Sequence, residues 1–163
     1  MEMRGEVRRG YFVNGLPGVQ FAKPEAVEKL RTIGSGADEL QTIICLSAMD
    51  PVNLYGGEIP DRPKTAKGDD LTFMRVPSTH CVIWQGKPVL VVEDNGERMT
   101  VMKDITSDVL QRAIKAYIKR PGAQRRVLIR EWNGKPVLGS AAQAWLQPLG
   151  FSRTPNGLEY WAD

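Results

Sequence analysis

The sequence contains few of the side chains that enzymes use most often for catalysis or for metal binding. Among its 163 residues there are one histidine, His80, and two cysteines, Cys45 and Cys81. Because neighbouring residues on a strand point to opposite faces, His80 and Cys81 cannot act together as base and nucleophile. One histidine and two distant cysteines also lack the paired spacing of a zinc site. We therefore expect no catalytic residue and no metal ion in this chain.

Two alternatives remain open for the cysteines. Each lies in an apolar, strand-like run, which favours buried and reduced thiols, and a disulfide between them is the other possibility. A cysteine hydrolase that uses Cys81 is the alternative enzyme hypothesis, and it predicts alkylation of that thiol at neutral pH. The acidic residues Glu93, Asp94 and Glu97 surround a predicted turn, where exposure gives no burial to raise a pKa, so we do not expect them to be catalytic.

Long apolar runs and nucleotide-binding loops are also missing. No run approaches the roughly 20 apolar residues that a membrane helix needs, and nothing near the N-terminus looks like a signal peptide. The glycines of residues 15–18 are not followed by the Gly-Lys-Ser/Thr that holds a nucleoside triphosphate. We expect a cytoplasmic chain that has no membrane contact and binds no cofactor of its own.

Positive charge is present in small excess and is unevenly distributed. The formal net charge is +3, but residues 103–135 carry nine Lys or Arg against three Asp or Glu. Such local asymmetry indicates a polyanionic partner more directly than the total charge does. The other interpretation is a helical surface that is charged for solubility.

The first candidate site is a predicted hairpin in residues 4–22. An Asn-Gly pair at residues 14–15 is a strong signal for a tight turn. Three cations (Arg4, Arg8 and Arg9) precede Tyr11 in this segment, and such a combination suits a phosphate backbone and an unstacked base. The alternative is a solvated edge strand whose arginines prevent edge-to-edge pairing.

The second candidate site lies in a later strand. With the two-residue period of a strand, Arg126, Arg130 and Trp132 would share one face, where arginines could hold phosphates while the indole stacks on a base. The alternative places Trp132 in the core and pairs the arginines with Glu131 or Asp108. The other three tryptophans lie in apolar elements, so we expect all of them in the core: Trp84, Trp145 and Trp161.

The apolar patterns predict an α+β fold, with a curved antiparallel sheet that could close into a barrel-like form and about three helices packed on it. Four Asn-Gly turns in a chain of this length favour a sheet-rich body. One face of the central strands should be buried and the other solvated. Residues 55–70 have little to bury and are expected to form a mobile surface loop. The predicted helices are residues 24–33, 107–120 and 140–149, and the predicted strands of the body are residues 40–46, 71–76, 79–85, 87–93, 98–102 and 126–132.

Several motifs in order resemble those of the large helicase-related (Lhr) proteins, a family of superfamily 2 DNA helicases. The family runs from an Arg-Gly-Glu-Val/Ile-Arg segment through a Gly-Leu-x-Gly-x-Gln-Phe-Ala turn into a Pro-Glu-Ala-Val helix, and residues 4–8, 15–22 and 24–27 match these elements. The likeness continues at residues 46–54, 75–77, 149–151 and 155–158, so it covers most of the chain. In the family this segment closes a winged helix and enters an accessory domain. The resemblance thus implies an extension from a winged helix over residues 1–22, followed by one α+β accessory domain over residues 23–163.

The resemblance also implies a function. Lhr helicases use ATP and Mg²⁺, held by motor domains that this chain does not contain, to move along single-stranded DNA and unwind DNA or RNA:DNA duplexes. The chain would help to form the channel for single-stranded DNA or an RNA:DNA hybrid, and would brace the winged helix against the other helicase domains. Arg4, Arg8 and Gln20 match the family motif and become the first candidate contacts. The alternative is a structural or protein-interaction module that never touches nucleic acid.

Overall fold

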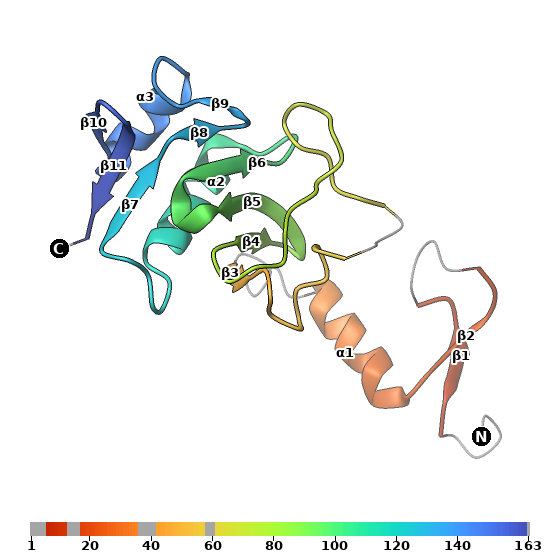
Figure 1. Ribbon diagram of the computed structural model, residues 1–163. Coiled ribbons are helices and arrows are strands. Elements are labelled where there is room, and N and C mark those ends of the chain that lie inside the picture. The colour runs from red at the N-terminus through yellow and green to blue at the C-terminus, as the bar shows by residue number, and fades with distance from the viewer. Residues whose placement is uncertain (1–5, 13–16, 36–41, 58–60, 163) are drawn as a thin grey trace. The chain divides into compact units, whose positions relative to one another are not determined.

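A computed structural model describes residues 6–12, 17–35, 42–57 and 61–162 (Figure 1). Contacts divide the chain into two compact units, Met1–Thr42 and Ile43–Asp163, which are described separately below. By this division the helix that follows residue 22 groups with the hairpin that precedes it. The predicted domain boundary after residue 22 stays a prediction, since a division by contacts does not by itself define domains.

In the described residues of the first unit, an antiparallel strand pair, β1 (Arg8–Gly10) and β2 (Gln20–Ala22), precedes helix α1 (Pro24–Ser35). The helix begins at Pro24, whose missing N–H costs no bond in a first turn, and Glu25 complements the positive end of the helix dipole. Gly10 pairs with Gln20, so residues 11–19 connect the strands. The predicted Asn-Gly turn at residues 14–15 lies outside the described residues.

The second unit is built on a six-stranded sheet with the order β3-β4-β5-β6-β8-β9. Its strands are β3 (Ile43–Ser47), β4 (His80–Trp84), β5 (Lys87–Glu93), β6 (Arg98–Val101), β8 (Glu131–Trp132) and β9 (Lys135–Pro136). The α+β class is confirmed, but two details of the predicted sheet are wrong. The sheet is open, with β3 and β9 at its edges, rather than barrel-like. It is also mixed, because β6 and β8 pair in parallel while the other neighbours are antiparallel.

A smaller antiparallel sheet has the order β10-β11-β7. Its strands are β10 (Ser152–Thr154), β11 (Gly157–Trp161) and β7 (Arg126–Ile129). The chain passes from β7 in this sheet directly into β8 in the large one. At the junction the backbone N–H groups of Arg130 and Glu131 both donate to the carbonyl oxygen of Glu97, at 2.8 and 3.0 Å. In this arrangement two residues lie opposite a single residue, as in a β-bulge. A bulge interrupts the two-residue alternation of side chains.

The described part of this unit also contains helices α2 (Ser107–Ile118) and α3 (Ala142–Leu146) and the short 3-10 turns η3 (Asp94–Gly96) and η4 (Gln147–Leu149). Helix α2 lies against β3, β4 and β5, and buries the side predicted from its periodicity, including Ala113, Ile114 and Tyr117. The predicted helix at residues 140–149 is divided between α3 and η4. Among the described residues, no helix combines the length and apolar character that crossing a bilayer requires.

Both faces of the central strands are buried, contrary to the prediction of one solvated face. Val82, Leu90 and Val92 belong to the main core beneath α2, whereas Cys81 and Val91 belong to a smaller cluster on the other side. That smaller cluster is covered by residues from the predicted surface loop and the segment after it: Tyr55, Leu71 and Phe73.

The predicted surface loop is tied to the sheet over its second half. The N–H of Lys103 donates to the carbonyl oxygen of Lys64, and the N–H of Ala66 donates to that of Val101, both at 2.9 Å. Thr65 forms a bridge with Met102 and is itself buried. A hydrophobicity pattern carries no information about which backbone groups form hydrogen bonds, so these contacts could not be predicted from the sequence.

Candidate nucleic-acid interface

The hairpin of the first unit places a cation beside exposed aromatic rings. Arg9 lies directly opposite Phe21, so their side chains share one face of the strand pair. Tyr11 follows Arg9 by two residues and comes directly after β1, which ends at Gly10. Phe21 is 59% exposed and Tyr11 is 78% exposed. Within the described residues, no carboxylate forms an ion pair with Arg9. We call Arg9, Tyr11 and Phe21 the hairpin face.

The other predicted hairpin residues are engaged within this unit or are not described. Arg8 donates from Nη1 to Oε1 of Glu28 at 3.3 Å, and Glu28 also accepts from Arg31 at 3.1 Å. The side-chain oxygen of Gln20 accepts a 2.7 Å hydrogen bond from the backbone N–H of Phe12, which holds the two strand ends together. Arg4 lies outside the described residues.

In the second unit, Arg126 and Arg130 line one polar cavity of about 510 Å³, together with Asp94 and Glu97. Each arginine has a carboxylate partner. Arg126 binds Glu159 through its Nε, and Arg130 binds Oε2 of Glu97 at 3.0 Å. The hydrogen bond from Arg126 lowers the pKa of Glu159. The partners suggested by the sequence, Glu131 and Asp108, are therefore not the ones that the fold supplies.

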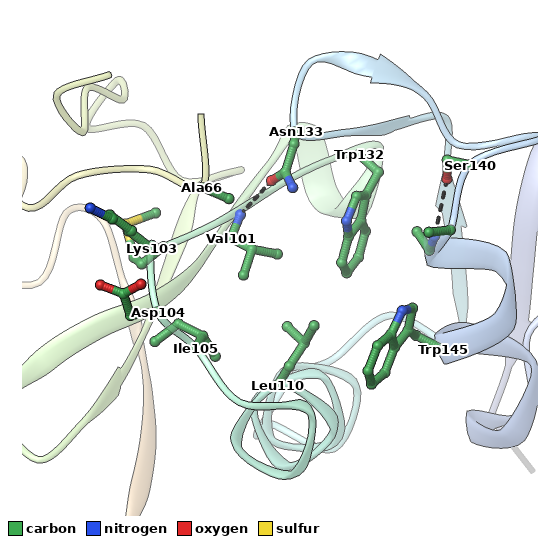
Figure 2. A pocket seen from close by; sticks show the side chains of 13 residues that line it. Ala66, Val101, Lys103, Asp104, Ile105, Leu110, Trp132, Asn133, Ser140 and Trp145 are labelled. Atoms are coloured by element: carbon green, nitrogen blue, oxygen red, sulfur yellow. Dashed lines mark hydrogen bonds between the residues drawn. The ribbon is translucent and has the colours of Figure 1, made fainter. Parts of the chain in front are cut away.

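Trp132 does not share this cavity. Its ring packs against the main core and points into a different cavity, which Figure 2 shows. The bulge at Arg130 and Glu131 explains the difference, because an extra residue moves the following side chain to the other face. The aromatic ring beside Arg126 is instead Trp161, its pairing partner on β11, with the guanidinium 5.8 Å from the ring centroid. Trp161 is 61% exposed and Trp145 is 37% exposed, so the predicted core positions of these two residues are wrong.

The chain matches the family model described as "Large helicase-related protein, winged-helix domain" over residues 1–42. It is 30% identical over 166 residues to the Escherichia coli (strain K12) protein named "Lhr helicase/uracil glycosylase". The matched region covers 98% of this chain and 10% of that protein. A Mycolicibacterium smegmatis protein named "Lhr helicase/ probable uracil glycosylase" is 30% identical over 173 residues, covering 96% of this chain and 11% of that protein.

The chain belongs to the Lhr family. It spans about a tenth of the length of the curated Lhr proteins that it matches. The family match ends at residue 42, where the contacts also divide the two units. The hairpin face thus lies in the segment that resembles an Lhr winged helix, and the second unit lies beyond it.

Neither cysteine has the lowered pKa that a nucleophilic thiol needs. Both are free, and burial raises the pKa of Cys45 to about 11 and that of Cys81 to about 12. A thiol with such a pKa holds almost no thiolate at neutral pH, which argues against the cysteine hydrolase alternative. Burial also lowers the pKa of His80. In the described part of the chain, no group of three or more His, Cys, Asp or Glu side chains could hold a metal ion.

Sequence reasoning missed Phe21 and Trp161. Phe21 could have been found, because pairing the two predicted strands places it opposite Arg9. Trp161 is harder to recognise, since it ends an apolar strand and only the pairing of β11 with β7 brings it to Arg126.

Proposed function

We propose that this chain is a non-motor accessory part of an Lhr helicase that contacts single-stranded nucleic acid. In this proposal it contributes to the channel for single-stranded DNA or an RNA:DNA hybrid and braces the winged helix against the motor domains. ATP and Mg²⁺ are bound by those motor domains, elsewhere in the parent protein. Support comes from the similarity to two proteins named Lhr helicases, which extends over nearly the whole chain.

The hairpin face is the observation that carries the proposal. A large exposed ring costs solvation free energy unless a partner covers it, and Tyr11 and Phe21 are both mostly exposed beside Arg9. A guanidinium next to two rings matches the chemistry of a single strand, in which charged phosphates alternate with flat bases. Such binding depends on the release of counterions and weakens as salt rises.

Arg126 and Arg130 are the second candidate contacts. They are about half exposed and line the same polar cavity, and each is paired with a carboxylate. A phosphate would have to replace Glu159 or Glu97, so the net gain per contact is smaller here than at Arg9. Exposed ion pairs of this kind contribute little net stability because water and salt screen them, so a phosphate can replace the carboxylate.

Fluorescence anisotropy with labelled single-stranded DNA tests the proposal. The full chain should bind at low salt, and log K should fall by about 0.7 for each phosphate neutralised per tenfold increase in salt. Arg9→Ala should weaken binding and reduce that slope by about 0.7, while the matched variant Lys29→Ala, on an exposed position of α1, should leave both unchanged. Absence of binding at low salt would favour the alternative, a structural or protein-interaction module.

A second candidate function is base excision, since both curated relatives carry uracil glycosylase in their names. From the sequence we did not expect Asp94 and Glu97 to be catalytic, but the polar cavity of the second unit holds their carboxylates beside the side-chain amides of Asn95, Gln124 and Asn156. Each carboxylate is paired with an arginine, Asp94 with Arg98 at 2.9 Å and Glu97 with Arg130 at 3.0 Å. In base excision a carboxylate directs water to the sugar carbon, the bond to the base breaks, and an amide can bind the edge of the extruded base.

Alkali-sensitive cleavage of uracil-containing single-stranded DNA tests this second candidate. Asp94→Asn and Glu97→Gln should each reduce cleavage strongly if this cavity is responsible. Glu6→Gln, on an exposed residue of the first unit, is the control and should have no effect. Cleavage that survives both cavity variants would reject this cavity as the site.

A further inference from the structure

Two tryptophans from different elements point into one cavity of the second unit (Figure 2). Trp132 comes from β8 and Trp145 from α3, and Leu110 of α2 lines the same cavity beside them. The cavity has a volume of about 560 Å³, within the range of about 300–1,000 Å³ that is typical of ligand sites. Trp145 is 37% exposed, so part of its ring has no protein cover.

A second cavity of about 680 Å³ lies beside the first. The two cavities share residues 102–105, which form the wall common to both. The second adds two more rings, Tyr55 and Trp84. The hydroxyl of Tyr55 donates to the carbonyl oxygen of Gly86, which holds that ring in place. We call the two cavities together the tryptophan groove.

The groove carries more positive than negative charge. Four cations line it, Arg62, Lys64, Lys87 and Lys103, against the carboxylates of Asp61 and Asp104. Lys64 is paired with Asp70 at 2.7 Å. Within the described residues, no carboxylate lies within 4.0 Å of the charged nitrogens of the other three cations. These three charges are therefore available to a polyanion.

The polar groups beside the two indoles are already used by the fold. Oδ1 of Asn133 accepts a 2.8 Å hydrogen bond from the N–H of Val101. The hydroxyl of Ser140 donates to the carbonyl oxygen of Val137 at 2.7 Å and accepts from the N–H of Ala142 at 3.3 Å. What the cavity offers a ligand is chiefly ring faces and cations, a set that suits stacking and charge neutralisation more than reading of base edges.

We propose that the tryptophan groove binds a single strand of nucleic acid, with bases stacked on Trp145 and Trp132 and phosphates held by Lys103 and Lys87. This inference rests on the proposed function and assigns the strand a path on the second unit, separate from the cavity of Arg126 and Arg130. Cations and rings are the two kinds of group that the phosphates and bases of a single strand need, and a stacking site tolerates any base. Binding here should therefore show little sequence preference.

Anisotropy with labelled single-stranded DNA, measured on the full chain, separates this groove from the other candidate surfaces. Trp145→Ala should weaken binding by about 10-fold or more, since stacking on one ring contributes about 5- to 150-fold in affinity. Met74→Ala is the control. It removes another exposed apolar side chain that lines neither cavity of the groove and belongs to no other candidate contact, and it should change affinity by less than about twofold.

Two further variants keep the test valid if Trp145→Ala disturbs α3. Trp145→Leu keeps an apolar side chain and should still lose the stacking contribution. Lys103→Gln leaves the core intact and should reduce the slope of log K against log salt by about 0.7. Circular dichroism of each variant verifies that the fold is retained.

The outcomes distinguish the two proposals. If the wild-type chain does not bind at low salt, the proposed function itself fails. If the wild-type chain binds, but the variants of Trp145 and Lys103 bind equally well, the groove assignment is overturned while the proposed function stands. If Trp161→Ala or Arg126→Ala abolishes binding while the groove variants still bind, the nucleic acid strand binds at the small sheet instead.

Discussion

At the scale of single residues, backbone geometry decides more than composition. Gly157 follows Asn156 in the turn between β10 and β11, with a φ of +146° that few side chains tolerate. A Cβ added there would overlap with the carbonyl oxygen of Ile129 on β7. The Asn-Gly pair was recognised in the sequence as a turn. That a third strand packs against this glycine could not be recognised, because the contact depends on the pairing of β11 with β7.

Gly157→Ala is expected to destabilise the second unit by about 2–4 kcal/mol, because both the backbone strain and the overlap with Ile129 must be relieved. Gly57→Ala is the matched control, since open space surrounds that position, and it should change stability by less than about 0.5 kcal/mol. Urea unfolding followed by circular dichroism measures both. Equal stability of the two variants would contradict the close approach at Gly157.

The two buried thiols give the chain a pH dependence in the alkaline range. Burial raises the pKa of Cys45 to about 11 and that of Cys81 to about 12, from the ordinary thiol value of 9.0. Above pH 9 the unfolded chain loses these protons while the folded chain keeps them, so ionisation stabilises the unfolded state. The thiol contribution is therefore fully present below pH 9 and is lost as the pH rises towards 11–12.

Unfolding free energies measured in urea at pH 8 and pH 10 should show this loss. The double variant Cys45→Ala/Cys81→Ala should lose less stability between the two pH values than the wild-type chain does. Burial also raises the pKa of Tyr55 and Tyr117, so the variant should retain part of the dependence. An identical loss in both proteins would show that the thiols do not contribute.

At the scale of elements, periodicity was a reliable guide for α2 and a misleading one for the strand at residues 126–132. The apolar spacing of α2 predicted its buried side correctly. For the strand at residues 126–132, the two-residue period predicted that Arg126, Arg130 and Trp132 would share one face. The structure brings the two arginines together but places Trp132 elsewhere, because the bulge at residues 130–131 lies where the chain moves from one sheet to the other.

Ile114→Ala in α2 is expected to destabilise the second unit by about 2–5 kcal/mol, since Ile114 is fully buried in the main core beneath the sheet. The adjacent Lys115 is exposed, so Lys115→Ala should change stability by less than about 0.5 kcal/mol. Thermal and urea unfolding report both values. A small effect of Ile114→Ala would mean that α2 does not form the core described here.

At the scale of the whole chain, the two units differ in how much they bury. The core clusters of the second unit draw all their residues from Ile43 onward. In the described part of the first unit, Val27 is the one buried apolar side chain. A unit with so little core has little stability of its own.

Residues 43–163, produced without residues 1–42, should therefore fold and unfold in one cooperative transition. Differential scanning calorimetry of the shortened and full chains checks this, and a loss of cooperative unfolding would contradict it. If the shortened chain folds, it should keep the strand binding assigned to the tryptophan groove and lose only the contribution of the hairpin face.

The sequence by itself determined the α+β class, the face of α2, the strand pair of the first unit and, through its motifs, membership of the Lhr family. These follow from local periodicity, turn residues and residue order. Tertiary structure alone decided that the sheet stays open, that both of its faces are covered, and that Trp132 and Trp145 line one cavity. Those outcomes depend on a bulge and on pairings between residues far apart in the chain, which no local pattern encodes.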